Sequence, residues 1–211
     1  NYNGELPVPQ LTKDATKARL VKVLSAKKGI SNGQTMSLDF NSIQDITGQA
    51  VETDGVWNID YTAPNDGDYI LFAFWQYGTS ETYKPAVTGE AYTINYLSHE
   101  GADALIEYWD EHVLTSELQE LIQQNGNVNM YMDSLELQPR GTDTTGNLWC
   151  ADYLEEFQNR RGYDVTKFLP ILILSNPSPW STNDTYKFTF DGEEQLCEKV
   201  RNDLYQTNTE L

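Results

Sequence analysis

Near its middle the chain reads Asn127-Val128-Asn129-Met130-Tyr131-Met132-Asp133 and continues as Ser134-Leu135-Glu136. The first seven of these residues predict a short strand bounded by polar side chains. Helical patterns stand before and after it, so this half of the chain runs helix, strand, loop, helix. That order is typical of a (β/α) barrel or of another α/β fold. The order therefore predicts an α/β protein and leaves open a TIM-type (β/α)₈ barrel or another α/β fold.

Two helices are expected ahead of this strand. Ser98 suits the N-cap of the first, and Leu105 and Ile106 belong to an apolar set at helical spacing. The second begins near residue 115, where Ser116 and Gln119 have the spacing of a capping box. In the second helix Leu118, Leu121 and Ile122 would face inward. Gly126 stands where that helix would end.

Two more helices are expected after the strand. The pattern over 148–161 is amphipathic and stops at Gly162. Arg160 and Arg161 close this helix, where positive charge favours the helix dipole. A last helix begins near Asp191 and continues to the end of the chain.

The first half of the chain has a different pattern, which is that of an antiparallel β segment. Turn residues at 64–68 separate two of its expected strands, so those two should form a hairpin. The change of pattern near residue 95 predicts a mainly β part over 1–94 and an α/β part over 95–211. The expected strands are Arg19–Ala26, Thr35–Phe40, Val56–Tyr61 and Tyr69–Trp75.

The composition excludes several classes of protein. Hydrophobic residues make up 39% and charged residues 22%, so the chain can bury a core and is not a disordered segment. The formal net charge of −18 disfavours nucleic acid, and no Lys/Arg cluster favours an anionic membrane. No apolar run approaches the roughly 20 residues of a membrane span. No signal peptide opens the chain, and we expect both ends to be trimmed or truncated.

Cysteine and histidine give little support for a metal or redox site. Cys150 and Cys197 either pair in an oxidising compartment or lie reduced in the core, and buried free thiols are the preferred interpretation. His99 and His112 fall in one helical segment with no other Cys or His near, so zinc is not expected. The surplus of carboxylates suits calcium better.

The strongest candidates for chemistry are Asp133 and Glu136. In (β/α)₈ enzymes the active site lies at the carboxyl ends of the strands, where these two residues are expected. Glycoside hydrolysis needs one protonated and one ionised carboxyl group, and a neighbouring negative charge such as Asp133 would raise the pKa of Glu136. The alternative is an acidic loop without a catalytic role. Stacking surfaces for a sugar ring are expected at Trp149, Trp180, Trp75 and Tyr77.

From Thr93 onward the sequence resembles the rhamnosidase-type hydrolases of glycoside hydrolase family 106. In the first half, Trp57–Tyr61 and Gly67-Asp68-Tyr69 resemble the small β insertion that interrupts the barrel of this family. The resemblance extends from Arg19 to Leu204. Its main pieces, in order, are Tyr96-Leu97-Ser98, Tyr108-Trp109, Met132-Asp133-Ser134-Leu135-Glu136, Leu154-Glu155-Glu156-Phe157, Arg160-Arg161-Gly162-Tyr163-Asp164 and Phe168-Leu169-Pro170.

The resemblance implies cleavage of a glycosidic bond within a (β/α)₈ barrel, with residues 1–94 as the β insertion and 95–211 as a barrel portion truncated at the C-terminus. Glu136 matches the family's glutamate after a barrel strand, and its partner carboxylate is expected from a later strand beyond the chain's end. Calcium near the sugar is also implied, with Asp133, Glu136 and Asp143 as candidate ligands. Asn95 departs from the family, since relatives often carry Asp there, which argues against a charged role.

The function expected from these features is that of an α-L-rhamnosidase-like glycoside hydrolase, a secreted, periplasmic or cell-surface bacterial protein that acts on rhamnose-containing or related glycans. Its partner would be an oligosaccharide or polysaccharide. Two alternatives remain: a non-catalytic carbohydrate-binding module that uses the same aromatic residues, and an inactive part of a larger glycosidase.

Overall fold

The computed structural model describes residues 1–9, 18–33, 35–78, 92–129, 131, 146–174 and 185–211. The strands, in chain order, are β1 (Tyr2–Glu5), β2 (Arg19–Asn32), β3 (Thr35–Leu38), β4 (Gln44–Asp45), β5 (Ala50–Thr53), β6 (Val56–Tyr61), β7 (Tyr69–Gln76) and β8 (Phe188–Phe190). The helices are α1 (His99–Tyr108), α2 (Ser116–Asn125), α3 (Tyr153–Arg161) and α4 (Glu194–Glu210). A π-helical turn, Trp109–Val113, follows α1, and a 3₁₀ helix, η4, spans Thr166–Leu172.

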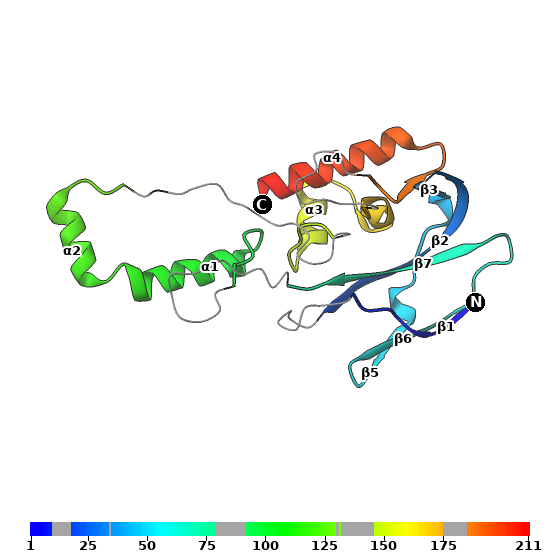
Figure 1. The fold of residues 1–211 in the computed structure, drawn as a ribbon, viewed down its shortest axis with the longest axis horizontal. Coiled ribbons are helices and arrows are strands. Elements are labelled where there is room, and N and C mark those ends of the chain that lie inside the picture. Colours follow the sequence, from blue (N-terminus) through cyan, green and yellow to red (C-terminus); the bar gives the residue numbers. More distant parts are fainter. Residues whose placement is uncertain (10–17, 34, 79–91, 130, 132–145, 175–184) are drawn as a thin grey trace.

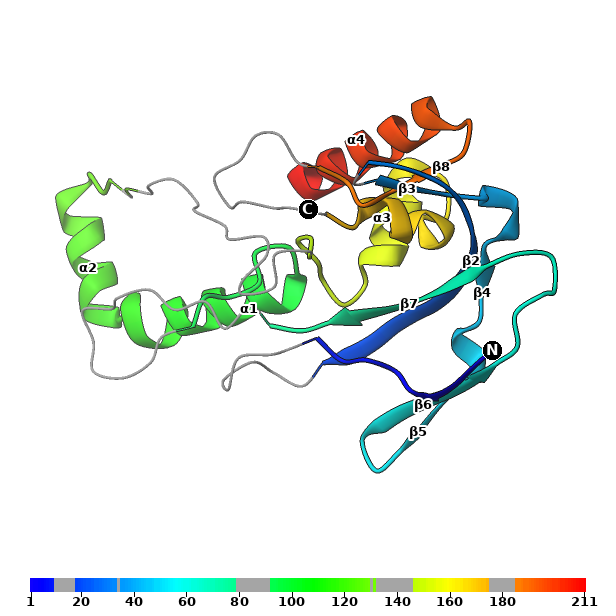
Figure 2. The ribbon, with the colours of Figure 1, turned by 45° about the vertical axis from the view of Figure 1, so that its right-hand side comes forward.

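The long strand β2 organises the body of the molecule (Figures 1 and 2). It pairs antiparallel with β7 and β4 along its first part and with β3 along its last part. β3 in turn pairs in parallel with β8, which brings residues far apart in the sequence into one sheet. A second, smaller antiparallel sheet has the order β1-β6-β5.

The strand β7 packs against a core on each of its faces, which explains its apolar sequence Tyr-Ile-Leu-Phe-Ala-Phe-Trp-Gln. Alternate residues of a strand point to opposite faces. Ile70, Phe72 and Phe74 pack into a core with α3, α4, η4 and β8. Leu71, Ala73 and Trp75 pack into a second core against the small sheet. The β2–β7 layer therefore lies between a helical layer and the small sheet.

The helical layer is held by α3 and α4, which pack side by side. Phe157 of α3 and Val200 of α4 are both fully buried. Arg161 of α3 is paired with Glu210 of α4, and Arg160 forms an i, i+4 ion pair with Glu156 at 3.0 Å. The structural role expected of the two arginines fits these contacts, because Arg161 ties the C-terminal end of α3 to α4 and Arg160 makes its ion pair within α3.

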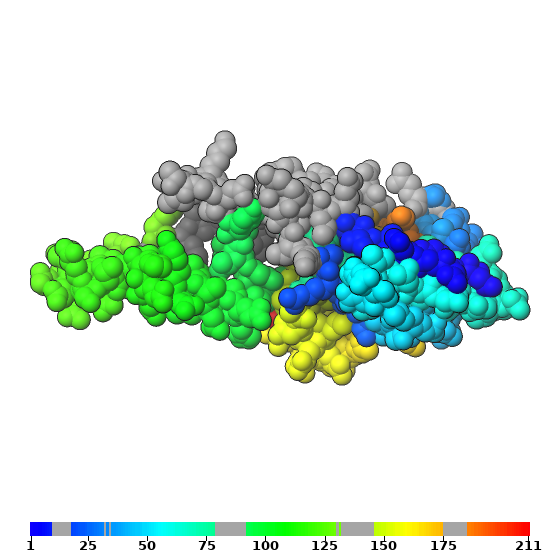
Figure 3. All heavy atoms as spheres, turned by 90° about the horizontal axis from the view of Figure 1, so that it is seen from below, coloured from blue at the N-terminus to red at the C-terminus, as the bar shows by residue number. Residues whose placement is uncertain are grey.

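The helices α1 and α2 form an arm (residues 99–125) that projects from the body (Figures 1 and 3). Ser98 caps α1 as expected, since its Oγ accepts from the Gly101 N–H at 3.0 Å. Gly126 ends α2 with a φ of 69°. The expected capping box is wrong by one residue: Thr115 is the N-cap of α2.

Neither helix of the arm has a buried residue, although the apolar face of α2 was expected to point inward. Leu105, Ile106 and Leu121 are 41%, 57% and 47% exposed. Their helical spacing was sufficient to predict the helices, because it sets the periodicity of the segment. The spacing did not predict whether these side chains are buried, because burial depends on a packing partner. No described residue of the body supplies one.

The barrel expectation is wrong. The described strands form no closed barrel, since β2 has antiparallel neighbours and the small sheet is antiparallel throughout. Among the described strands only β3 and β8 run parallel. Asn127, Val128, Asn129 and Tyr131, the described part of the expected strand, form no strand and are exposed. The observed fold is a mixed α/β domain with antiparallel sheets.

The expected hairpin is also wrong, although both of its strands exist. β6 pairs with β1 and β5, whereas β7 pairs with β2. The turn between them leads from the small sheet into the β2–β7 layer. Asp66 in this turn binds Lys27 of β2 at 2.9 Å, and a Cβ at Gly67 would lie 2.5 Å from the Lys27 Cε. The turn residues therefore dock on β2 instead of closing a hairpin.

The contact between Tyr163 and Asp203 allows a prediction on acid stability. The Tyr163 hydroxyl donates to an Asp203 carboxylate oxygen at 2.6 Å, and Lys199 Nζ donates to the same oxygen at 2.5 Å. Burial raises the pKa of Asp203, but these hydrogen bonds outweigh it and hold the pKa below its ordinary value of 3.8. The ionised group therefore stabilises the fold above the unfolded-state pKa, and this contribution is lost as pH falls through the folded-state pKa.

We expect Asp203→Asn to lower the free energy of unfolding by about 1 kcal/mol at neutral pH. The gap between variant and wild type should close as pH falls below about 4, because the wild-type carboxyl becomes neutral as well. Urea unfolding at a series of pH values measures this gap. A gap that stays constant with pH would show that the charge of Asp203 contributes nothing.

Candidate functional site

The principal residues of the expected active site lie outside the described residues. These are Glu136 and Asp133, together with Trp180 and the candidate calcium ligand Asp143. Their roles stay predictions. The described residues that flank this segment in the sequence are Tyr131 on one side and residues 146–153 on the other.

Asn95 ties the start of α1 to the segment that follows residue 145. Its Nδ2 donates to the Trp149 carbonyl oxygen at 3.0 Å, and its Oδ1 accepts from the Leu97 N–H at 3.0 Å. An amide supplies both a donor and an acceptor, whereas an ionised carboxylate only accepts. Asn95 therefore makes a bond to the Trp149 carbonyl oxygen that an ionised aspartate could not make.

The turn that contains Asn95 is closely packed against α1. The Asn95 carbonyl oxygen accepts from the Ser98 N–H at 3.3 Å. A Cβ at Gly101 would lie 2.1 Å from that same oxygen, so the first turn of α1 requires glycine at this position. Leu97, between them, is 8% exposed and belongs to the larger core. The Tyr96-Leu97-Ser98 piece of the sequence therefore anchors the arm to the body.

Trp149 lies on the larger core at the same place. Its ring stacks on Tyr153 with centroids 4.3 Å apart, and Tyr153 is fully buried. Asn147 Nδ2 donates to the Leu172 carbonyl oxygen at 3.1 Å, which fixes the chain two residues earlier. The half-buried Trp149 is thus held on a rigid support. Such a support suits an aromatic ring that binds sugar, and stacking at Trp149 stays a prediction.

Trp75 and Tyr77 lie elsewhere in the fold. Trp75 packs into the core on the small-sheet side of β7, and its buried Nε1 has no hydrogen-bond partner among the described residues. Trp149 packs against the helical core on the other side of β7. Tyr77 is half-buried just after β7. The structure therefore does not gather Trp75 and Trp149 on one face, and a single sugar site would use only one of them.

Cys150 and Cys197 are buried free thiols, as the sequence favoured. Burial, with a hydrogen bond to Asp152, raises the pKa of Cys150 to about 12. The thiol is therefore protonated at neutral pH, and only the thiolate is a good nucleophile. Cys150 lies next to Trp149 in the sequence but is chemically inert.

The part of the chain that the structure describes contains no group of three His, Cys, Asp or Glu side chains that could hold a metal ion. The calcium implied by the resemblance therefore has no described ligand set, and no chemical step is assigned to it. Among the described helices, none is long and apolar enough to cross a membrane.

Comparison with known families identifies the chain. The family model of the α-L-rhamnosidases, glycoside hydrolase family 106, matches residues 10–211. The chain therefore belongs to the α-L-rhamnosidase family, and at the level of the family it is a glycoside hydrolase. No curated protein and no solved structure matches the chain.

The Asn95 contact can be tested directly. Asn95→Asp removes the donor to the Trp149 carbonyl and places a carboxylate against that oxygen. We expect the free energy of unfolding to fall by about 1 kcal/mol at neutral pH. Asn129→Asp, at an exposed position beyond the end of α2, is the matched control and should change it by less than about 0.5 kcal/mol. Equal effects of the two variants in urea unfolding would contradict the assigned role of Asn95.

Proposed function

We propose that this protein is an α-L-rhamnosidase-type glycoside hydrolase that cleaves rhamnose-containing or related glycans. The observation that carries the proposal is the family match over residues 10–211, which includes the Asp-Ser-Leu-Glu piece ending at Glu136. The net charge of −18 fits a neutral glycan better than a nucleic acid. The expected substrates lie outside the cell, so we also propose an extracytoplasmic location.

In the proposed mechanism Glu136 is the general acid. It gives its proton to the glycosidic oxygen as the bond to the anomeric carbon breaks, and the leaving group departs as an alcohol. A second carboxylate removes a proton from water, whose oxygen forms the new bond to the anomeric carbon. In an inverting enzyme the two carboxyl groups lie roughly 6.5–9.5 Å apart, which leaves room for that water.

The neighbouring acidic residue supports this role. Ionised Asp133, three positions before Glu136, would raise the pKa of Glu136 by disfavouring a second negative charge. A raised pKa keeps the acid protonated near neutral pH, where its proton is needed. Trp149, stacked on the buried Tyr153, is proposed as the aromatic surface that orients the sugar.

The test is hydrolysis of 4-nitrophenyl α-L-rhamnopyranoside by the full-length protein, followed by nitrophenolate release. Turnover supports the proposal. Binding of methyl α-L-rhamnopyranoside without turnover would favour the non-catalytic carbohydrate-binding alternative. If the protein neither binds nor hydrolyses these compounds, rhamnosides are rejected as its substrate class.

A further inference from the structure

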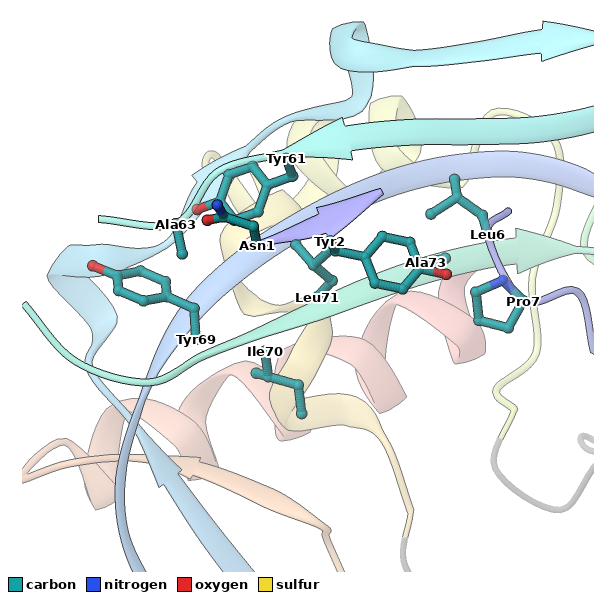
Figure 4. Close-up of a pocket in the computed structure, with 10 residues that line it drawn as sticks. All are labelled: Asn1, Tyr2, Leu6, Pro7, Tyr61, Ala63, Tyr69, Ile70, Leu71 and Ala73. Atoms are coloured by element: carbon teal, nitrogen blue, oxygen red, sulfur yellow. The ribbon is translucent and has the colours of Figure 1, made fainter. Parts of the chain in front are cut away.

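A hollow of about 360 Å³ lies between β1 and β7, on the small-sheet side of the β2–β7 layer (Figure 4). This size falls within the range of small-ligand sites. Three tyrosines from different strands line it: Tyr2 of β1, Tyr61 of β6 and Tyr69 of β7. Leu71 and Ala73 of β7 also line it, and both pack on the small-sheet side of β7.

Two of the tyrosine rings in this hollow differ in how much of their surface is exposed to solvent. Tyr61 is 5% exposed and its hydroxyl donates to the buried Ser25 Oγ at 2.9 Å, so its ring is fixed by the fold. Tyr2 is 39% exposed, so its ring is open to solvent on one side. A ligand with an apolar face would gain contact with both without opening the core.

The three tyrosine hydroxyls of the hollow are available as hydrogen-bond acceptors, and Asn1 adds a side-chain amide. The Tyr69 hydroxyl donates to the Asp66 carboxylate at 3.1 Å, and the Tyr2 hydroxyl donates to the Glu5 carbonyl oxygen. The Tyr61 hydroxyl donates to Ser25. A tyrosine hydroxyl has one proton to donate, so each of these oxygens keeps only its acceptor capacity. The hollow therefore suits a ligand that brings several O–H donors.

The charges near the hollow select against an anion. Asp66, which holds the Tyr69 hydroxyl, is matched by Lys27 at 2.9 Å, and the chain as a whole has a net charge of −18. A negatively charged ligand would meet the tyrosine acceptor oxygens and the negative charge of the chain as a whole. A neutral molecule with hydroxyl donors on one edge and C–H groups on the other meets neither penalty.

We infer that this hollow is a second carbohydrate-binding site, distinct from the segment that carries Glu136, and that it takes one neutral pyranose ring. A 6-deoxyhexose fits the walls well, because its methyl group adds apolar surface for the Leu71–Ala73 floor. The inference rests on the proposed function only in the choice of a rhamnoside as the probe.

The experiment is a calorimetric titration of the full-length protein with methyl α-L-rhamnopyranoside, carried out with Glu136→Gln so that no substrate is consumed. Two variants alter the hollow in opposite ways. Tyr2→Ala removes an exposed ring, and Ala63→Trp fills the hollow with a large side chain at a half-buried lining position. Tyr108→Ala, at a tyrosine that is 58% exposed on α1, is the matched control.

We expect Tyr2→Ala and Ala63→Trp each to weaken rhamnoside binding at one site at least tenfold, and Tyr108→Ala to leave it unchanged. Circular dichroism confirms that each variant is folded. Titrations of folded Tyr2→Ala and Ala63→Trp that match the parent would overturn the inference. If rhamnoside binding depends on Tyr2 but the wild-type protein hydrolyses no rhamnoside, the site in the hollow is upheld and the proposed function is rejected. If the wild-type protein hydrolyses rhamnosides but no binding depends on Tyr2, the proposed function is upheld and the site in the hollow is rejected.

Discussion

Glu136→Gln is expected to lower kcat for α-L-rhamnoside hydrolysis by about 10²- to 10⁴-fold, the range of a lost general acid. Glutamine has nearly the same size and still forms hydrogen bonds, but it has no acidic proton to give to the leaving oxygen. Substrate binding should therefore survive. The measurement is kcat and KM for rhamnoside hydrolysis, together with the Kd of methyl α-L-rhamnopyranoside from calorimetry.

Two comparisons make this result specific. Glu117→Gln, an exposed glutamate in the first turn of α2, changes the same functional group outside the candidate site and should leave kcat unchanged. Asp133→Asn should lower the pKa of Glu136 and shift the basic limb of the pH–rate profile to lower pH. Unchanged turnover in Glu136→Gln would reject the acid role.

Phe157→Ala is expected to have the largest effect on stability. Phe157 is fully buried in the larger core and meets the Tyr163 ring edge-on, with centroids 5.2 Å apart. Truncation removes most of a large apolar side chain and leaves a cavity between α3 and its neighbours. We expect the free energy of unfolding to fall by about 3–5 kcal/mol.

The exposed arm provides the control for this prediction. Ile106→Ala removes a smaller apolar group from α1, where the side chain is 57% exposed, and should change the free energy of unfolding by less than about 0.5 kcal/mol. Both values come from urea unfolding followed by circular dichroism. A loss below about 1 kcal/mol for Phe157→Ala would contradict the placement of Phe157 in the core.

The sequence predicted individual elements better than their pairing. The strand over Tyr69–Trp75 was expected and is present as β7, because its aromatic and β-branched residues suit a buried strand. Its pairing with β2 was not expected. The sequence of a strand that is apolar on both faces does not specify which strand it pairs with. The turn residues next to β7 therefore suggested pairing with β6, whereas β7 pairs with β2.

The barrel was predicted from local alternation of helix and strand, which does not fix the direction of distant strands. The parallel pair of β3 and β8 joins residues 36–38 to residues 188–190, a contact that no local pattern encodes. Val128 and Tyr131 are apolar enough to suggest a buried strand, yet they are 59% and 84% exposed. Composition alone could not distinguish a buried strand from an exposed connection.

The candidate site was predictable to the same limited extent. The Asp-Ser-Leu-Glu piece and the family resemblance pointed to Glu136, and the family match confirms the family. The role of Asn95 was missed, because its partner is the backbone carbonyl of Trp149. Every residue has a backbone carbonyl, so the sequence cannot indicate which one accepts this hydrogen bond. Tyr2, Tyr61 and Tyr69 were likewise missed as a group, because they come from three strands that only the fold brings together.

Glu136 is proposed to protonate the leaving oxygen of a rhamnoside. The most direct test compares kcat/KM of wild type and Glu136→Gln on two substrates whose leaving groups differ in basicity. Methoxide needs protonation to depart, whereas 4-nitrophenolate departs largely without it. We predict a much greater loss for methyl α-L-rhamnopyranoside than for the 4-nitrophenyl glycoside; equal losses on both substrates would contradict the claim.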